Sequence, residues 1–236
     1  MPKKRAAPDD DAAPSKRIRI PSYSGWLASL HLKYADRPTY KGASEKKAGG
    51  SEVKAKLGPK SNKGMGTDAN PKLPRGIEEV RKKFPKETWI AGHLLNADVG
   101  GDGNEPNNMA VLTSSTNALM KSQESALKDG VDYLSKVYEA IHAAGIFDPK
   151  EISISVTVTA THHDSLPFPD CYIARTIKQN ASLNNKNSFS IGDIKLGEEN
   201  RKGKLLKDIT DALDKVTAAL NKANDSVTQT NWKGKA

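Results

Sequence analysis

The chain has 236 residues and a net charge of +9, with 37 Lys and Arg residues against 28 Asp and Glu residues. This basic balance favours an anionic partner, with nucleic acid or an acidic surface as the leading classes. Cys171 is the single cysteine, which excludes a disulfide framework and a cysteine-based zinc site, and no apolar stretch is long enough to span a bilayer, so we expect no membrane partner.

The first predicted element is a basic tail over residues 1–25. Two basic clusters lie on either side of a spacer rich in Ala, Pro and Asp, and they consist of Lys3, Lys4 and Arg5, and of Lys16, Arg17 and Arg19. The arrangement resembles a bipartite nuclear localisation signal, whose clusters occupy two acidic pockets of a nuclear import receptor. The alternative interpretation is an ordinary solvated basic arm. We expect the nucleus as the location, and the cytoplasm if the arm is only solvated.

Residues 26–76 are predicted to hold a short helix and a flexible basic linker. Apolar residues at positions 23, 26, 27, 30 and 34 fit one face of a helix, which we expect to dock on the main domain. Residues 41–75 are rich in Gly, Lys, Ser and Pro without hydrophobic periodicity, which is typical of a linker. The low hydrophobic share of the chain, 36%, agrees with a disordered amino-terminal region.

A folded domain of the α+β class is predicted over residues 77–225. Residues 87–95 favour a strand that ends near a histidine, and the Gly-rich residues 99–108 favour a loop. Residues 111–113 are the candidate second strand, with the loop as the connection between the two. Residues 116–144 predict a long helix, whose apolar stripe consists of Leu119, Leu127, Val131, Leu134, Tyr138 and Ile141.

The second half of this domain is predicted to supply further sheet and helix. Residues 151–161 alternate Ile and Val with Ser and Thr, which is typical of a half-buried strand, and residues 170–177 are its candidate partner. Residues 203–224 predict a second amphipathic helix. Residues 226–236 have the composition of a polar tail.

The residues with the most chemical content surround His93. Gly92 and His93 end the first predicted strand of the domain, whereas Asn117 and Glu124 lie seven residues apart and share one face of the long helix. A neutral histidine titrates in the range needed to deprotonate an attacking water. Oxygen ligands such as an amide and a carboxylate suit Mg²⁺, which neutralises charge on a phosphate. The set therefore favours phosphodiester hydrolysis at a one-metal site.

The segment 89–124, about a sixth of the chain, resembles the ββα-metal (His-Me finger) nucleases. The resemblance rests on the Gly92-His93 pair at a strand end, on the Gly-Gly turn that follows, on Asn108 before the second strand, and on the helical Asn and Glu. It is closest to the DNA/RNA non-specific endonucleases and, through its short finger loop, to the toxin-type versions.

This resemblance implies a ββα finger core with an antiparallel sheet and long helices. It also implies that His93 is the general base, that Asn117 and Glu124 bind Mg²⁺ or Mn²⁺, with Glu124 also part of the catalytic set, and that Gly92 and Asn108 support the site. The implied partner is DNA or RNA, cleaved with little sequence preference. With the nuclear signal, the resemblance suggests a toxin or effector delivered to a target cell.

One departure from the family bears on activity. Many members carry an Arg directly before the Gly-His pair, where this chain has Ile90-Ala91. Arg81 or Arg175 would have to contact the phosphate instead, or the contact is absent. The alternative function is therefore a catalytically inactive nuclear module of the same fold that binds nucleic acid or a protein. No base-reading motif is present, so both DNA and RNA stay open as substrates, and the oligomeric state is open as well.

Overall fold

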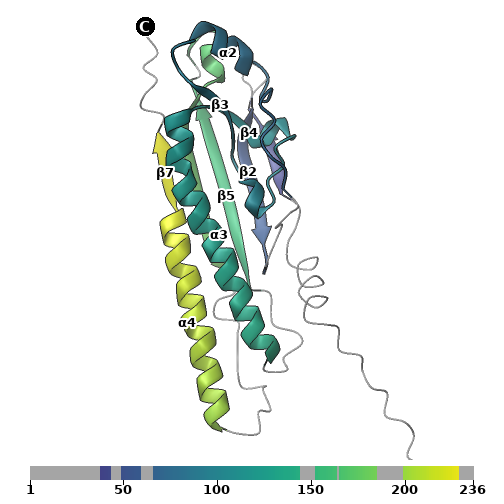
Figure 1. Cartoon of the computed structure of the whole chain (residues 1–236), viewed down its shortest axis with the longest axis vertical. Coiled ribbons are helices and arrows are strands. Elements are labelled where there is room, and N and C mark those ends of the chain that lie inside the picture. Colours follow the sequence, from purple (N-terminus) through teal and green to yellow (C-terminus); the bar gives the residue numbers. More distant parts are fainter. Residues whose placement is uncertain are drawn as a thin grey trace, which may run out of the picture.

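The computed structural model describes residues 38–43, 49–59, 66–143, 152–163, 165–184 and 199–228. The predicted nuclear localisation signal and most of the short helix expected after it lie outside these residues. Within them the chain folds as an α+β protein, with antiparallel sheets and two long helices, as predicted (Figure 1). In the described part of the chain, no helix is long and apolar enough to cross a membrane.

The main sheet has five antiparallel strands in the order β1-β2-β5-β6-β7. Their bounds are Thr39–Gly42 (β1), Gly50–Leu57 (β2), Ser153–His162 (β5), Ala174–Asn184 (β6) and Asp225–Thr228 (β7). The predicted strand at 151–161 is confirmed by β5. Its predicted partner at 170–177 is right in part, because β6 starts only at Ala174 and is preceded by a 3₁₀ turn, η3 (Asp170–Tyr172).

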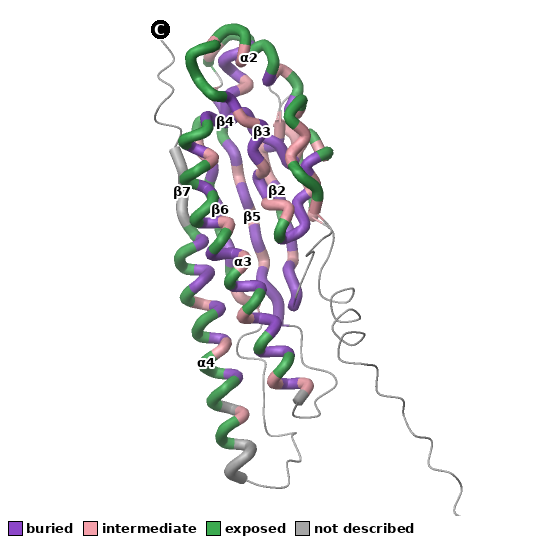
Figure 2. Tube along the Cα trace, in the orientation of Figure 1, coloured by how far each residue is buried: buried purple, intermediate pink, exposed green. Residues whose placement is uncertain are grey.

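One face of this sheet is apolar and the other is polar. Along β5, Ile154, Val156 and Val158 are buried, whereas the Ser and Thr residues between them are partly exposed. Helices α3 (Ser114–Ala143) and α4 (Glu199–Ala223) cover the apolar face and pack against each other. Figure 2 shows the buried residues along β5 and along the neighbouring sides of both helices.

The predicted long helix is confirmed, with one correction to its apolar stripe. Leu119 is 59% exposed, although the other five residues of the predicted stripe are buried. Thr116, Met120 and Gln123 extend the buried stripe towards the start of α3 instead. The physical reason is the helix phase: residue 119 precedes the buried position 120 by one residue, which turns its side chain by about 100° towards solvent.

The second sheet is a two-stranded ribbon that leads directly into α3. Strand β3 (Trp89–His93) pairs antiparallel with β4 (Met109–Thr113), and α3 begins at the next residue, Ser114. The predicted pairing of the strand around residues 87–95 with a strand after the Gly-rich loop is confirmed. A short helix, α2 (Ile77–Lys83), packs on the ribbon from the side away from α3.

The prediction of a flexible linker over residues 41–75 is wrong for its first part. Strand β2 lies inside the sheet, between β1 and β5, and its side chains Val53, Ala55 and Leu57 are buried. The strand carries only these three apolar residues, separated by lysines, and its partner β5 lies about 100 residues later, so the local pattern resembled a basic linker. The folded domain therefore starts by Thr39 and not at residue 77.

The prediction of a polar tail from residue 226 is also wrong where the structure describes it. Strand β7 (Asp225–Thr228) pairs with residues 176–179 of β6 and forms one edge of the sheet. Asn224 fixes this return of the chain, because its amide donates to the Ala181 carbonyl at 2.8 Å and its carbonyl accepts from the Ala181 amide. Residues 229–236 lie outside the described residues.

Candidate active site

The candidate site lies where β3 ends and the loop to β4 begins, beside the first turns of α3. Gly92 permits this arrangement. A Cβ atom at position 92 would lie 2.4 Å from the Leu112 side chain and 3.1 Å from Oδ1 of Asn117. The absence of a side chain therefore lets the start of α3 approach the backbone of β3, directly beside His93.

His93 is half-buried and is held by a backbone carbonyl. Its Nε2 atom lies 3.0 Å from the carbonyl oxygen of Thr67. Because a carbonyl only accepts hydrogen bonds, Nε2 carries the proton and the lone pair of the neutral ring is on Nδ1. Burial lowers the pKa of His93 below 6.5, against the opposing effects of the Thr67 carbonyl and of the Asp68 and Asp102 charges. At neutral pH the ring is therefore a neutral base.

Thr67, whose carbonyl holds this histidine, could not be recognised from the sequence. The backbone amide of Thr67 donates to the Gly101 carbonyl at 3.1 Å. Its hydroxyl donates to Asp102 Oδ1 at 2.6 Å and accepts from the Gly103 amide at 2.8 Å. The segment around residue 67, which we expected to be part of the linker, is thus fastened to the Gly-rich loop.

Asn108, predicted as a supporting residue, joins the two ends of the loop. Its side chain is fully buried. Oδ1 accepts from the Leu95 amide at 2.9 Å, and Nδ2 donates to the carbonyls of Leu95 and Asp102 at 3.1 and 3.0 Å. One amide side chain thereby satisfies two buried backbone groups of Leu95 and the part-buried carbonyl of Asp102, which stabilises the loop against opening.

Asn117 lies in the first turns of α3 and is half-buried. Its Oδ1 atom faces the backbone of Gly92, and none of the described residues forms a hydrogen bond with its side chain. Because neighbouring Cα atoms are about 3.8 Å apart, this oxygen lies within about 8.5 Å of the Cα atom of His93.

Glu124 meets the same loop two helical turns later. Its Oε2 atom accepts from Asn96 Nδ2 at 2.9 Å, and Oδ1 of Asn96 accepts from the Asp98 amide at 2.7 Å. Burial raises the pKa of Glu124 above 4.5, although the Asn96 hydrogen bond and the charge of Lys121 act in the opposite direction. The carboxylate is thus anchored to the loop and partly withdrawn from water.

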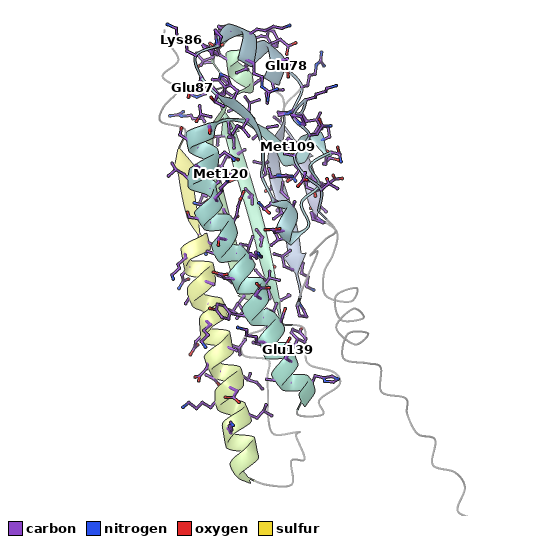
Figure 3. All side chains as sticks on the ribbon, in the orientation of Figure 1. Glu78, Lys86, Glu87, Met109, Met120 and Glu139 are labelled. Atoms are coloured by element: carbon purple, nitrogen blue, oxygen red, sulfur yellow. The ribbon has the colours of Figure 1, made fainter. Side chains whose placement is uncertain are left out.

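The predicted residues do not all meet on one side of β3. His93 pairs with Met109, labelled in Figure 3, and alternation along the strand puts both on the face shared by Trp89 and Ala91. Gly92 faces α3 and therefore Asn117. In the described part of the chain, no hydrogen bond joins the His93 ring to Asn117 or to Glu124, so the imidazole and the amide reach the strand end from its two sides.

Neither candidate arginine lies at this strand end. Arg81 donates to Glu78 at 2.5 Å, to the Pro71 carbonyl at 3.0 Å and, from Nε and Nη2, to the carbonyl of Trp89. Trp89 is four residues from His93, about 13 Å along the strand, so Arg81 stabilises the far end of the ribbon. Arg175 is exposed at the start of β6.

Asn117 carries an amide oxygen and Glu124 a carboxylate, which are ligand types that Mg²⁺ and Mn²⁺ accept, but Asn117 Oδ1 faces Gly92 and Glu124 Oε2 accepts from Asn96. Among the described residues, no group of three or more His, Cys, Asp or Glu side chains could hold a metal ion. Comparison of the chain with known protein families, with curated proteins and with solved structures found no match. The functional argument therefore rests on the site itself.

Proposed function

We propose that this protein is a metal-dependent nuclease that hydrolyses phosphodiester bonds of DNA or RNA without sequence preference. The observation that carries the proposal is the state of His93. Its Nε2–H is committed to the Thr67 carbonyl, and burial keeps the ring neutral at pH 7, so Nδ1 is a base beside a Gly-rich loop.

In the proposed reaction, Nδ1 of His93 accepts the proton of the water that attacks phosphorus. The Thr67 carbonyl keeps the ring in place during this transfer, and the negative charges of Asp68 and Asp102 stabilise the imidazolium that forms. Asn117 and Glu124 would hold Mg²⁺ or Mn²⁺. When bound there, the cation supplies positive charge to neutralise the phosphate. Asn108 keeps the loop closed around these groups.

The basic clusters of residues 1–25 extend the proposal to a biological setting. If they act as a nuclear localisation signal, the protein is a toxin or effector that degrades nucleic acid in the nucleus of a target cell. Fusion of residues 1–25 to a fluorescent reporter tests this part separately. Nuclear accumulation that is lost when Lys16 and Arg17 are changed to Ala would support it, whereas a uniform distribution would contradict it.

The nuclease proposal is tested by incubating plasmid DNA and total RNA with the purified full chain, with Mg²⁺ or Mn²⁺ and with EDTA. Loss of a general base typically lowers the rate 10²- to 10⁴-fold, and we expect roughly this loss for His93→Ala. His142→Ala, a substitution in the last turn of α3, is the matched control and should leave the rate unchanged. The cleavage rate should rise with pH as His93 loses its proton, below pH 6.5, and then level off. Cleavage by His93→Ala at the wild-type rate would overturn the proposal.

A second candidate function is a nucleic-acid- or protein-binding module without catalysis. The approach of His93 and Asn117 from opposite sides of β3 favours it, as do the positions of both arginines away from the strand end. A folded wild-type protein that binds DNA or RNA in gel-shift assays, yet cleaves neither with any of Mg²⁺, Mn²⁺ and Ca²⁺, would establish this function instead.

A further inference from the structure

The face of the main sheet opposite α3 and α4 is polar across four strands. We call this surface the outer sheet face, and its argued members are Lys41, Lys54, Lys56, Thr157, Lys178 and Asn180. Lys54 pairs with Thr157, and Thr157 with Asn180, so one row of the register runs across three strands on the same face. Alternation along each strand sends the apolar neighbours of these residues to the helices.

The charge of the outer sheet face is strongly positive. Lys41, Lys54 and Lys178 are exposed, and Lys56 is partly exposed. Glu52 is the one carboxylate at an outward position in the described strands β1, β2, β5 and β6, and it forms an ion pair with Lys54 at 3.0 Å. Four lysines against one carboxylate make this face a surface for an anion.

The face also has a hollow where the short strand β1 begins beside β2. Its volume is about 270 Å³, and its lining includes Thr39, Lys54, Lys56, Ser155 and Thr157. Two ammonium groups and the hydroxyl groups of Ser155 and Thr157 supply donors for phosphate oxygens around this depression, whereas the Thr39 hydroxyl donates to the Lys54 carbonyl. None of the outward positions in the described strands carries an aromatic side chain, so bases have no surface on which to stack.

The outer sheet face is connected to the candidate active site through β1. Tyr40, the neighbour of Lys41, accepts a hydrogen bond from the Asp102 amide at 3.1 Å through its hydroxyl oxygen. Gly50, at the start of β2, lies so close to the finger loop that a Cβ atom there would be 1.9 Å from the Asn107 carbonyl oxygen. The strands that carry Lys41, Lys54 and Lys56 therefore also hold the loop that follows His93.

We propose that the outer sheet face binds the sugar–phosphate backbone of the nucleic acid substrate, as a sequence-independent contact outside the cleavage site. The proposal rests on the nuclease function for the identity of the ligand. Lysines and hydroxyls contact phosphates, whereas the lack of aromatic side chains leaves the bases unread. This contact lowers KM and makes binding more strongly dependent on salt, but it takes no part in the chemical step.

The test measures binding of a fluorescein-labelled 24-base-pair DNA duplex and of the equivalent RNA duplex by anisotropy, in the full chain carrying His93→Ala. Lys54→Gln with Lys56→Gln should raise Kd by roughly tenfold and reduce the slope of log K against log salt by about 1.8, because each phosphate contact contributes about 0.9. Lys215→Gln with Lys222→Gln removes the same charge from exposed positions two turns apart on α4 and is the matched control. The control pair should leave the slope unchanged.

Cleavage by the same variants on an otherwise wild-type chain separates the two proposals. A raised KM at unchanged kcat for Lys54→Gln with Lys56→Gln supports the outer sheet face. If the wild type binds through these lysines but never cleaves, the nuclease proposal fails and the binding surface stands. The proposal for the outer sheet face would be overturned if the slope of log K against log salt were equal for the two double variants, or if neither duplex bound. This holds whether or not cleavage is found.

Discussion

At the scale of single residues, Glu124 is a half-buried carboxylate whose charge lowers the stability of the fold. The fold partly removes this carboxylate from water and gives it one amide hydrogen bond, and burial raises its pKa. A raised pKa means that the folded state binds the proton more tightly than the unfolded state does. Its charged form therefore lowers stability as pH rises from 4.5 through the folded pKa. If residue 124 served only to accept the hydrogen bond from Asn96, the protein would be more stable with Gln at this position.

Glu124→Gln should accordingly stabilise the protein at pH 7 and weaken metal-dependent cleavage. The Gln carbonyl still accepts from Asn96 but has no charge to bury, so Tm at pH 7 rises, and the difference from the wild type vanishes near pH 4. Loss of a carboxylate that holds the metal or its waters should lower activity roughly 10- to 100-fold. Thermal unfolding at several pH values and plasmid cleavage measure the two effects.

Glu139→Gln is the control for this prediction, because Glu139 is exposed on the same helix (Figure 3). It should change neither Tm nor cleavage. A Glu124→Gln protein that is less stable at pH 7, or that cleaves as fast as the wild type, would show that the carboxylate has only a structural role.

At the scale of elements, β2 provides a direct test of the corrected domain boundary. Lys54 and Lys56 are trypsin sites in the sequence, but Lys54 is paired with both β1 and β5, and Lys56 is paired with β5. Folded protein should resist cleavage after these lysines, since trypsin needs an extended and accessible backbone. Limited proteolysis followed by mass spectrometry checks this, with the buried-site variant Val53→Asp as the positive control. Rapid cleavage after Lys54 in the wild type would instead support the prediction that this segment is a flexible linker.

The elements that the sequence predicted correctly are those whose pattern is local. The ribbon of β3 and β4 follows from two short apolar runs around a Gly-rich loop, and α3 follows from its helical stripe. Strands β2 and β7 were missed because their few apolar residues acquire meaning only beside β5 and β6. Their pairing partners are distant in sequence or lie beyond a helix, and no local periodicity reveals them.

For the candidate site, the sequence proposed residues but not their geometry. Asn108 was expected to support the site, and it makes three hydrogen bonds to the backbone of the Gly-rich loop. Thr67 could not be found, because it acts on His93 through a backbone carbonyl, which every residue type carries. The face of β3 on which His93 lies could have been predicted, because residues 89, 91 and 93 are two positions apart and share one face of a strand.

At the scale of the whole molecule, the ribbon joins two hydrophobic clusters. Leu112 belongs to the main core with α3, α4 and the sheet, whereas Met109 belongs to a smaller cluster with α2, and both are fully buried. Strand β4 thus has one face in each cluster, with Ala110 and Leu112 in the main core and Met109 and Val111 in the smaller cluster. This position holds the loop after His93 between two packed bodies.

Met109→Ala and Leu112→Ala should therefore each lower the Tm of a single unfolding transition that both clusters share. Each truncation of a buried side chain typically costs about 2–5 kcal/mol, which lowers Tm by roughly 5–15 °C in a domain of this size. Circular dichroism follows the whole fold, and the fluorescence of the buried Trp89 follows the smaller cluster once Trp26 and Trp232 are changed to Phe. Two separate transitions in Met109→Ala would show that the clusters fold independently.

The strand order of the sheet also means that neighbouring strands leave the ribosome at different times. About 100 residues separate β2 from its neighbour β5, which corresponds to roughly 5–20 s of synthesis. During that interval the contiguous segment of β3, β4 and α3 already contains His93, Asn117 and Glu124. The residues of the candidate site are thus synthesised before most of the sheet that supports them, and chains that stop before residue 153 leave the inner edge of β2 open to other strands.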